Sequence, residues 1–263
     1  MARPAPEPSD ASVDDACARS GALSIASYNI HSGVGLDGRC SASRIARVLQ
    51  ELDCDVFALQ EVDNQPGEHE ESMQLDYFAR VLNMTAVPGL RIVRHTGEYG
   101  NAVLTRLPVI SVRRHDLSHS GFEPRGALDV RMELQGCELR VIATHLGLRR
   151  AERRAQWRTL MAVLAQAPDD LPTILIGDMN EWYRRAATLR QAHTAFGEPP
   201  APVGFPSFAP CLALTRIWVR PLRSLLSLRV HRPSARYASD HLPMKAVVDV
   251  AKLLGLATSC GYR

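Results

Sequence analysis

The sequence predicts an α+β domain in which two β-sheets pack face to face and helices flank them. Short apolar runs separated by glycine and proline recur along the chain, as expected for strands. A strand, helix, strand order occurs twice, and strands of antiparallel character lie between the two occurrences. Together these features favour two packed sheets covered by helices. The 263 residues, of which 46% are hydrophobic, are enough to bury a large core.

The folded domain is expected to cover residues 23–250 as one unit, because no compositional shift marks a linker inside it. Residues 1–22 are rich in Pro, Ala, Ser and Asp and predict a flexible N-terminal tail. Residues 251–263 are expected to form a C-terminal tail. The domain opens with LSIASYNIH, a short strand that brings Asn29 and His31 to its carboxyl end.

A helix and a second strand are expected next. Ser41 or Ser43 suits the N-cap of the helix, whose apolar face consists of Ile45, Val48, Leu49 and Leu52. The apolar run from Val56 predicts a buried strand that ends at Glu61. A second amphipathic helix is expected over 71–82.

The middle of the chain predicts a series of antiparallel strands. These strands are expected at 86–95, 99–106, 108–117, 125–134 and 137–146. A helix over 150–166 and a strand ending in Asp178 then repeat the opening order. Residues 181–210 lack recognisable elements and suit substrate-specific loops. Further apolar segments close the sheets at 212–219, 225–232 and 241–250.

The two strand, helix, strand units are similar in length. Asn29 and Glu61 are 32 positions apart, and His145 and Asp178 are 33 apart. Nearly equal spacing is expected if two similar halves pack about a pseudo-twofold axis and share one mouth.

Composition restricts the partners and the compartment. The formal net charge is +3, which is too small to attract a polyanion through its bulk field alone. The six cysteines are scattered without a C-x-x-C pair, and residues 1–22 have no apolar signal region. No window holds 18 uninterrupted apolar residues, so we expect no transmembrane segment and a cytoplasmic location. No obligate protein partner is predicted.

Polar side chains interrupt or follow the predicted strands, and their types suit hydrolysis. They are Asn29, Glu61, Tyr99, Asn101, Arg125, His145, Asp178, Asn180, Asp240 and His241. A carboxylate such as Glu61 suits Mg²⁺, while Asp178 and Asn180 can orient water and donate to a phosphoryl oxygen. Asp240 and His241 place a carboxylate beside an imidazole. Any one of these residues alone also suits a turn or a core contact, so the joint pattern carries the prediction.

Seven segments resemble, in order, the signatures of the endonuclease/exonuclease/phosphatase superfamily. They are SYNIH, LQEVD, YGNAVLTR, RGAL, THLG, GDMNEW and SDHLP, and they span residues 24 to about 250. The resemblance, closest to small bacterial members, implies a four-layer α/β/β/α sandwich of the deoxyribonuclease-I type. It also implies a metal-dependent phosphoester hydrolase that uses Mg²⁺, with Mn²⁺ as an alternative.

The same resemblance implies roles for individual residues. The metal would be bound by Glu61, Asn29 and Asp240. The catalytic residues would be His145, Asp178, Asn180 and His241. Substrate would contact Tyr99, Asn101, Arg125 and Trp182.

The sequence departs from the family pattern at two positions. Relatives usually carry Asp in a segment like L-D-R-I, where its carboxylate holds the terminal histidine, but here the residue is Thr215. A threonine hydroxyl has no charge to favour an imidazolium at His241. We therefore expect a slower enzyme than typical relatives, or another acid that holds His241. The second departure lies two residues after Asn29. Relatives often carry an acidic residue there, next to the metal, whereas this sequence has His31.

The substrate class stays open at this point. A nuclease-type phosphodiesterase is the main prediction, and the partner is a phosphoester: nucleic acid, a small phospho-compound or a lipid headgroup. A phosphatase, a sphingomyelinase-like lipid phosphodiesterase and a non-catalytic binding protein on the same scaffold are the alternatives. Five arginines and Trp157 in residues 148–158 suit a phosphate-rich ligand or a solvated helix face. Trp182 and Tyr183 are expected to border the mouth.

Overall fold

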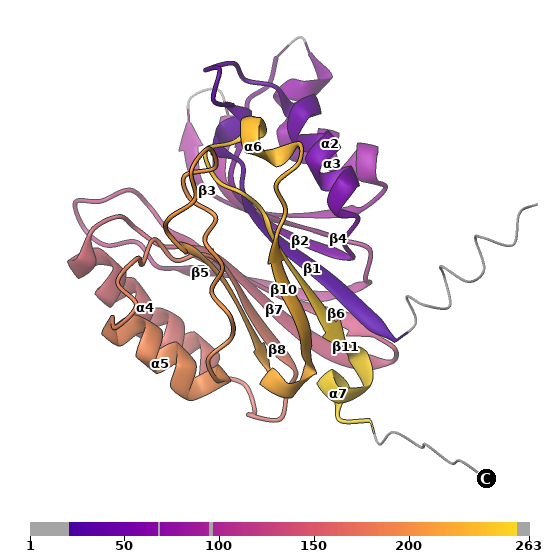
Figure 1. Ribbon diagram of the computed structural model, residues 1–263, viewed down its shortest axis with the longest axis vertical. Coiled ribbons are helices and arrows are strands. Elements are labelled where there is room, and N and C mark those ends of the chain that lie inside the picture. Colours follow the sequence, from indigo (N-terminus) through magenta and orange to yellow (C-terminus); the bar gives the residue numbers. More distant parts are fainter. Residues whose placement is uncertain (1–20, 68, 95–96, 257–263) are drawn as a thin grey trace, which may run out of the picture.

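Two β-sheets form the centre of the computed structural model, which describes residues 21–67, 69–94 and 97–256 (Figure 1). The first sheet has six strands in the order β10-β11-β1-β2-β4-β3, and the second has five in the order β5-β6-β7-β8-β9. The strands are β1 Ala22–Asn29, β2 Val56–Asn64, β3 Thr85–Arg94, β4 Gly97–Thr105, β5 Val109–Asp116, β6 Gly126–Leu134, β7 Cys137–His145, β8 Thr173–Asp178, β9 Thr215–Arg220, β10 Leu225–Val230 and β11 Met244–Asp249. The α-helices are α2 Ala42–Leu52, α3 Gln74–Leu82, α4 Arg150–Leu164, α5 Ala187–Phe196, α6 Ala235–Ala238 and α7 Val250–Leu254.

The core has three apolar layers, as the burial of alternate strand residues requires. Ile25, Val130 and Ile176 belong to the layer between the two sheets. The helices α2 and α3 cover the outer face of the first sheet, and α4 and α5 cover that of the second (Figure 1). The predicted four-layer sandwich is therefore confirmed.

The strand order also shows the repeat expected from the sequence. β1 pairs with β2 in parallel and β7 pairs with β8 in parallel, each pair joined by a helix. Antiparallel strands flank each pair, β11 and β4 in one sheet and β6 and β9 in the other. Parallel neighbours end at the same edge of a sheet, so the ends of β1, β2, β7 and β8 define the mouth.

Helix α5 shows that the expectation of an irregular stretch over 181–210 was wrong for its middle part. Its buried face includes Leu189, Ala192 and Phe196, spaced three and four positions apart. The helix is short, and no side chain caps its N-terminus at Ala186, so the usual start signal is absent from the sequence. Helix α2, by contrast, is capped as expected, because the Ser41 side chain accepts from the backbone N–H of Arg44.

The chain continues past residue 250 as α7, where Leu253 is buried. The expected C-terminal tail over 251–263 was therefore wrong for residues 251–254, and the parts of the two expected tails at 1–20 and 257–263 lie outside the described residues. Among the described helices, none has the length and apolarity needed to cross a membrane. Trp157 and the guanidinium of Arg153 are buried on α4, so the arginine-rich segment is only partly a solvated face.

Candidate active site

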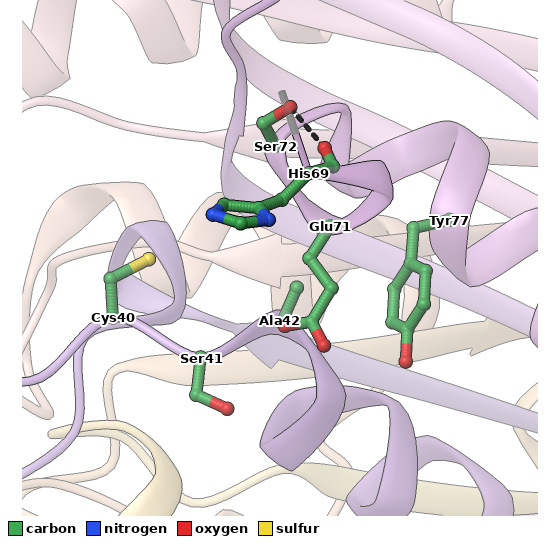
Figure 2. A pocket seen from close by; sticks show the side chains of 7 residues that line it. All are labelled: Cys40, Ser41, Ala42, His69, Glu71, Ser72 and Tyr77. Atoms are coloured by element: carbon green, nitrogen blue, oxygen red, sulfur yellow. Dashed lines mark hydrogen bonds between the residues drawn. The ribbon is translucent and has the colours of Figure 1, made fainter. Parts of the chain in front are cut away.

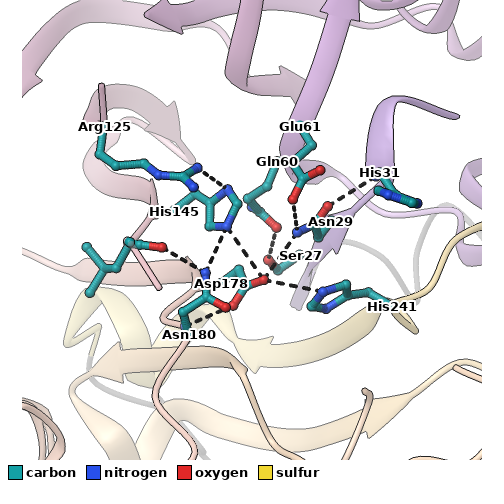
Figure 3. Close-up of polar contacts among 12 residues, drawn as sticks. Ser27, Asn29, His31, Gln60, Glu61, Arg125, His145, Asp178, Asn180 and His241 are labelled. Atoms are coloured by element: carbon teal, nitrogen blue, oxygen red, sulfur yellow. Dashed lines mark hydrogen bonds and ion pairs between the residues drawn. The ribbon is translucent and has the colours of Figure 1, made fainter. Parts of the chain in front are cut away.

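Polar side chains from both sheets meet at the mouth (Figure 3). β1 ends at Asn29, β7 at His145 and β8 at Asp178. Asn29 Nδ2 lies 3.2 Å from Asp178 Oδ2, although the two residues are 149 positions apart in the chain. This contact joins the ends of the two sheets and places residues from both halves in one site.

Asp178 is the centre of the site. Its Oδ2 lies 3.6 Å from His241 Nε2 and 3.8 Å from His145 Nε2, and its Oδ1 accepts from the backbone N–H of Asn180 at 2.9 Å. Burial by itself raises the pKa of Asp178. Electrostatic interactions with the His241 and His145 imidazoles, with hydrogen bonds from Asn180 and Asn29, outweigh burial and lower this pKa below its usual value. The carboxylate is therefore ionised at neutral pH.

Glu61 reaches the site because β2 contains a bulge. Leu59 and Val62 both pack against the helices, and regular alternation does not allow this at a spacing of three. The pairing with β4 shows one extra residue between them, and Glu61 has a φ of +59°. Asn29 Nδ2 donates to Glu61 Oε1 at 2.8 Å. The bulge thus turns a side chain that would face the helices toward the mouth.

His145 is held by a cation. Arg125 Nη1 lies 2.9 Å from His145 Nδ1. Burial, followed by the positive charge of Arg125, lowers the pKa of His145 to about 3, so the ring is neutral at pH 7. A guanidinium only donates, so Nδ1 accepts and the ring proton lies on Nε2. Asn180 Nδ2 lies 3.0 Å from His145 Nε2, and it also donates to the Leu146 carbonyl at 2.8 Å. Two donors therefore converge beside Asp178.

Close backbone packing at Gly177 brings His145 next to Asp178. These two residues are register partners in the parallel pair of β7 and β8. A Cβ atom on Gly177 would lie 1.9 Å from the Thr144 carbonyl oxygen, so only glycine fits there. Asn180 follows in a left-handed conformation with φ +49°, which asparagine tolerates better than most residues.

The segment before β11 brings Asp240 and His241 to the site. Ser239 Oγ donates to the Asn29 carbonyl at 2.8 Å and accepts from the backbone N–H of His241 at 3.2 Å. Asp240 is partly exposed, and its Oδ1 lies 3.8 Å from His31 Nδ1. The sequence-based prediction omitted Ser239, although its place directly before Asp240 and His241 was a usable signal.

Tyr99, Asn101, Arg125 and His145 line a narrow crevice of about 10 Å³, room for about one water molecule. Burial, followed by the negative charge of Glu61, raises the pKa of Tyr99, so its hydroxyl stays protonated. Asn101 Nδ2 donates to the Gly126 carbonyl at 3.1 Å. Its amide therefore ties β4 to the start of β6, next to Arg125.

Trp182 and Thr215 lie beside this network. Trp182 is 52% exposed, and its ring packs over the guanidinium of Arg153. Thr215 is buried and is the register partner of Asp178 in the pair of β8 and β9. Among the described contacts, the carboxylate near His241 is that of Asp178. Ser27 and Gln60, also omitted from the prediction, form a buried hydrogen bond behind the site.

The donor types of the site suit a hard divalent cation. No group of three His, Cys, Asp or Glu side chains in the described ranges is arranged to hold a metal ion. Glu61 provides a partly exposed carboxylate at the mouth, and the nitrogen of the Asn29 amide, rather than its oxygen, faces it. Mg²⁺ is often held by one or two carboxylates with water and substrate phosphate as its other ligands, so this donor set fits.

A larger pocket of about 680 Å³ shares no residue with this network. Figure 2 shows its lining side chains, which include Cys40, His69, Glu71 and Tyr77. Glu71 Oε2 accepts from the backbone N–H of Ser43 in the first turn of α2. A carboxylate there stabilises the positive end of the helix dipole, so Glu71 has a structural role.

Comparisons with known proteins agree with the geometry. The Uncharacterized protein YbhP of Escherichia coli (strain K12) is 29% identical over 246 residues, covering 86% of this chain and 96% of that protein. The crystal structure of an endonuclease/exonuclease/phosphatase from Beutenbergia cavernae is similar with a TM-score of 0.69 and 22% identity, over 87% of this chain and 72% of that one. The Bacteroides thetaiotaomicron mannosyl-6-phosphatase Bt3783 is similar with a TM-score of 0.65 and 20% identity, over 86% of this chain and 99% of that one.

The family model matches most of the chain. The Endonuclease/Exonuclease/phosphatase family model covers residues 26–241, a range that contains every residue of the site from Asn29 to His241. Members of this family generally hydrolyse phosphoester bonds and commonly use divalent metal ions. This chain belongs to the Endonuclease/Exonuclease/phosphatase family.

Proposed function

We propose that this protein is a divalent-metal-dependent phosphodiesterase of the nuclease type, in which water attacks phosphorus in line with the leaving oxygen. One observation carries the proposal: an ionised, buried Asp178 lies among two histidines and two asparagine amides at the shared mouth. A buried carboxylate with a lowered pKa, ringed by donors, is a functional arrangement rather than a turn.

Asp178 orients the attacking water and accepts its proton. Its Oδ2 is the oxygen toward which Asn29, His145 and His241 converge. A general base has to lie within hydrogen-bond reach of the proton that it removes, and substrate water would have to bind against this oxygen.

The donors stabilise the charge that develops on the phosphoryl oxygens. His145 Nε2–H and Asn180 Nδ2 lie 3.0 Å apart beside Asp178, and a phosphoryl oxygen bound there would accept from both. His241 Nε2 is a third donor on the other side of Asp178. Arg125 keeps the His145 proton on Nε2, and Tyr99 and Asn101 shape the crevice beside it. Trp182 contacts the part of the substrate that extends from the mouth.

A bound Mg²⁺, or Mn²⁺ in its place, supplies positive charge that neutralises the phosphoryl oxygens. Glu61 would hold it, with Asp240 as a further carboxylate. Asn29 would keep Glu61 in place through its amide nitrogen. The strained backbone at Glu61 supports this assignment, because such strain collects at functional residues.

A panel of substrates tests the proposal: plasmid DNA, abasic oligonucleotide, RNA, sphingomyelin, inositol phosphates and mannose 6-phosphate, each with Mg²⁺, Mn²⁺ or EDTA. We expect cleavage of a polynucleotide that EDTA abolishes. Asp178→Asn should lower the rate at least about 100-fold. The exposed Asp170 supplies a matched control, since Asp170→Asn should leave the rate unchanged.

A phosphatase is the second candidate, because one similar fold is a mannosyl-6-phosphatase. Cleavage of phosphomonoesters alone would favour it, and cleavage of sphingomyelin alone would favour a lipid phosphodiesterase. Calorimetry covers the remaining alternative: no Mg²⁺ binding, with no hydrolysis of any substrate in the panel, would indicate a non-catalytic binding protein and refute the proposal.

A further inference from the structure

A pocket of about 400 Å³ opens directly beside the candidate active site. Two chain segments form it, the one that follows His145 and the one that follows Asn180. Leu148 is three residues past His145 and Trp182 is two residues past Asn180, so both lie within about 11 Å of the site along the chain. A volume of this size holds a ligand fragment as large as a nucleotide.

The floor of the pocket is rigid. Arg153 is buried, and its Nε lies 3.3 Å from Glu181 Oε2 while its Nη1 donates to the Leu148 carbonyl at 2.6 Å. The guanidinium carbon lies 4.9 Å from the centre of the Trp182 ring. A buried ion pair therefore fixes a cation beneath the indole, which stays 52% exposed and offers ring surface to a ligand.

The rim of the pocket is aromatic and cationic. Tyr183 is 56% exposed, and Arg149 and Arg150 are exposed at the start of α4. Within the described chain, neither arginine forms an ion pair with a carboxylate. Two guanidinium groups without acidic partners suit an anionic ligand, because guanidinium pairs well with phosphate oxygens.

Building on the proposed phosphodiesterase function, we propose that this pocket binds a base and the adjoining phosphate of a single-stranded polynucleotide, next to the phosphodiester that is cleaved. Aromatic faces that stack bases, together with cations along the backbone, are the features by which single strands are bound. Membrane binding would require a group of apolar side chains that project from the surface. Leu148, 64% exposed on the rim, is one such side chain, but the Trp182 ring lines a hollow and rests on a buried cation.

Trp182 is itself a reporter for the test. The chain has three tryptophans, and Trp157 and Trp218 are 1% and 0% exposed. Tryptophan emission is recorded while a ten-residue oligodeoxythymidylate is added in EDTA, which prevents turnover. We expect saturable quenching, and protection of the emission from acrylamide, because a stacked base covers the one exposed indole.

Variants assign the effect to the pocket. The affinity for a dye-labelled oligonucleotide, measured by fluorescence anisotropy, should fall about 5-fold to 150-fold in Trp182→Ala, from the usual strength of base stacking. Trp182→Phe keeps a ring and should retain most of the affinity. Arg150→Ala should reduce the slope of log affinity against log salt by roughly 0.7. Arg158→Ala removes an exposed arginine elsewhere on α4 and should change neither quantity.

The outcomes separate the two proposals. Phosphodiester cleavage with no quenching by the oligonucleotide would overturn the pocket assignment and leave the proposed function intact. Quenching without cleavage of any phosphoester would support the pocket and refute the proposed function. Quenching by vesicles of phosphatidylcholine and phosphatidylglycerol, but not by the oligonucleotide, would overturn the assignment in favour of a lipid surface.

Discussion

The bulge at Glu61 predicts an unusual order of stability between two variants. Glu61→Ala and Glu61→Gly both remove the carboxylate and its contact with Asn29, so their difference isolates the backbone. An L-residue pays about 1–2 kcal/mol to adopt the left-handed conformation that Glu61 has at φ +59°. Glycine avoids this cost but loses about 0.4–1 kcal/mol through the greater freedom of its unfolded chain. Glu61→Gly should therefore be more stable than Glu61→Ala by about 1 kcal/mol.

Urea unfolding followed by circular dichroism measures this difference as a shift in midpoint at constant slope. Glu133, exposed in the regular strand β6, provides the control. There the order should reverse, with the glycine variant less stable than the alanine variant by roughly 0.5–1 kcal/mol. An alanine variant at position 61 as stable as the glycine variant would refute the bulge as the device that aims Glu61. Both variants at position 61 should lose phosphoester hydrolysis.

Three further predictions concern Asp178 and its neighbours. Gly177→Ala should destabilise the fold by at least about 2 kcal/mol, because the new Cβ would lie 1.9 Å from the Thr144 carbonyl oxygen. Thermal unfolding measures this loss of stability. The control is Gly121→Ala, which should destabilise the fold less, because Gly121 has a positive φ but open space around it. The lowered pKa of Asp178 means that its ionised form stabilises the fold above the ordinary carboxyl pKa of about 3.9, and that this contribution is lost as pH falls below that value toward the folded pKa. The difference in unfolding free energy between wild type and Asp178→Asn should thus shrink below about pH 4, and a constant difference would contradict the assigned ionisation. Thr215→Asp should raise the hydrolysis rate about tenfold or more because the new carboxylate would hold His241 as in relatives, whereas an unchanged rate with an intact fold would remove the idea that Thr215 limits the enzyme.

The individual strands and the position of the mouth were predictable from sequence because they depend on local pattern. Apolar runs that end in Asn29, His145 and Asp178 mark buried parallel strands, and the carboxyl ends of such strands lie at one edge. Helix α5 was missed because its three buried apolar residues give only a short pattern, and no side chain caps its N-terminus. The sequence placed Trp182 at the mouth but left open whether Trp157 contacts a ligand, and the structure shows that Trp157 is a core residue while Trp182 is exposed beside the site.

The sequence by itself determined the four layers and the set of polar residues at the strand ends, since periodicity and chain order encode both. Only the tertiary structure decided which of those residues touch. The contact between Asn29 and Asp178 joins positions 149 apart, and the orientation of Glu61 depends on one extra residue in β2 relative to β4. Both facts arise from the pairing of distant strands, and no local pattern of side chains specifies that pairing.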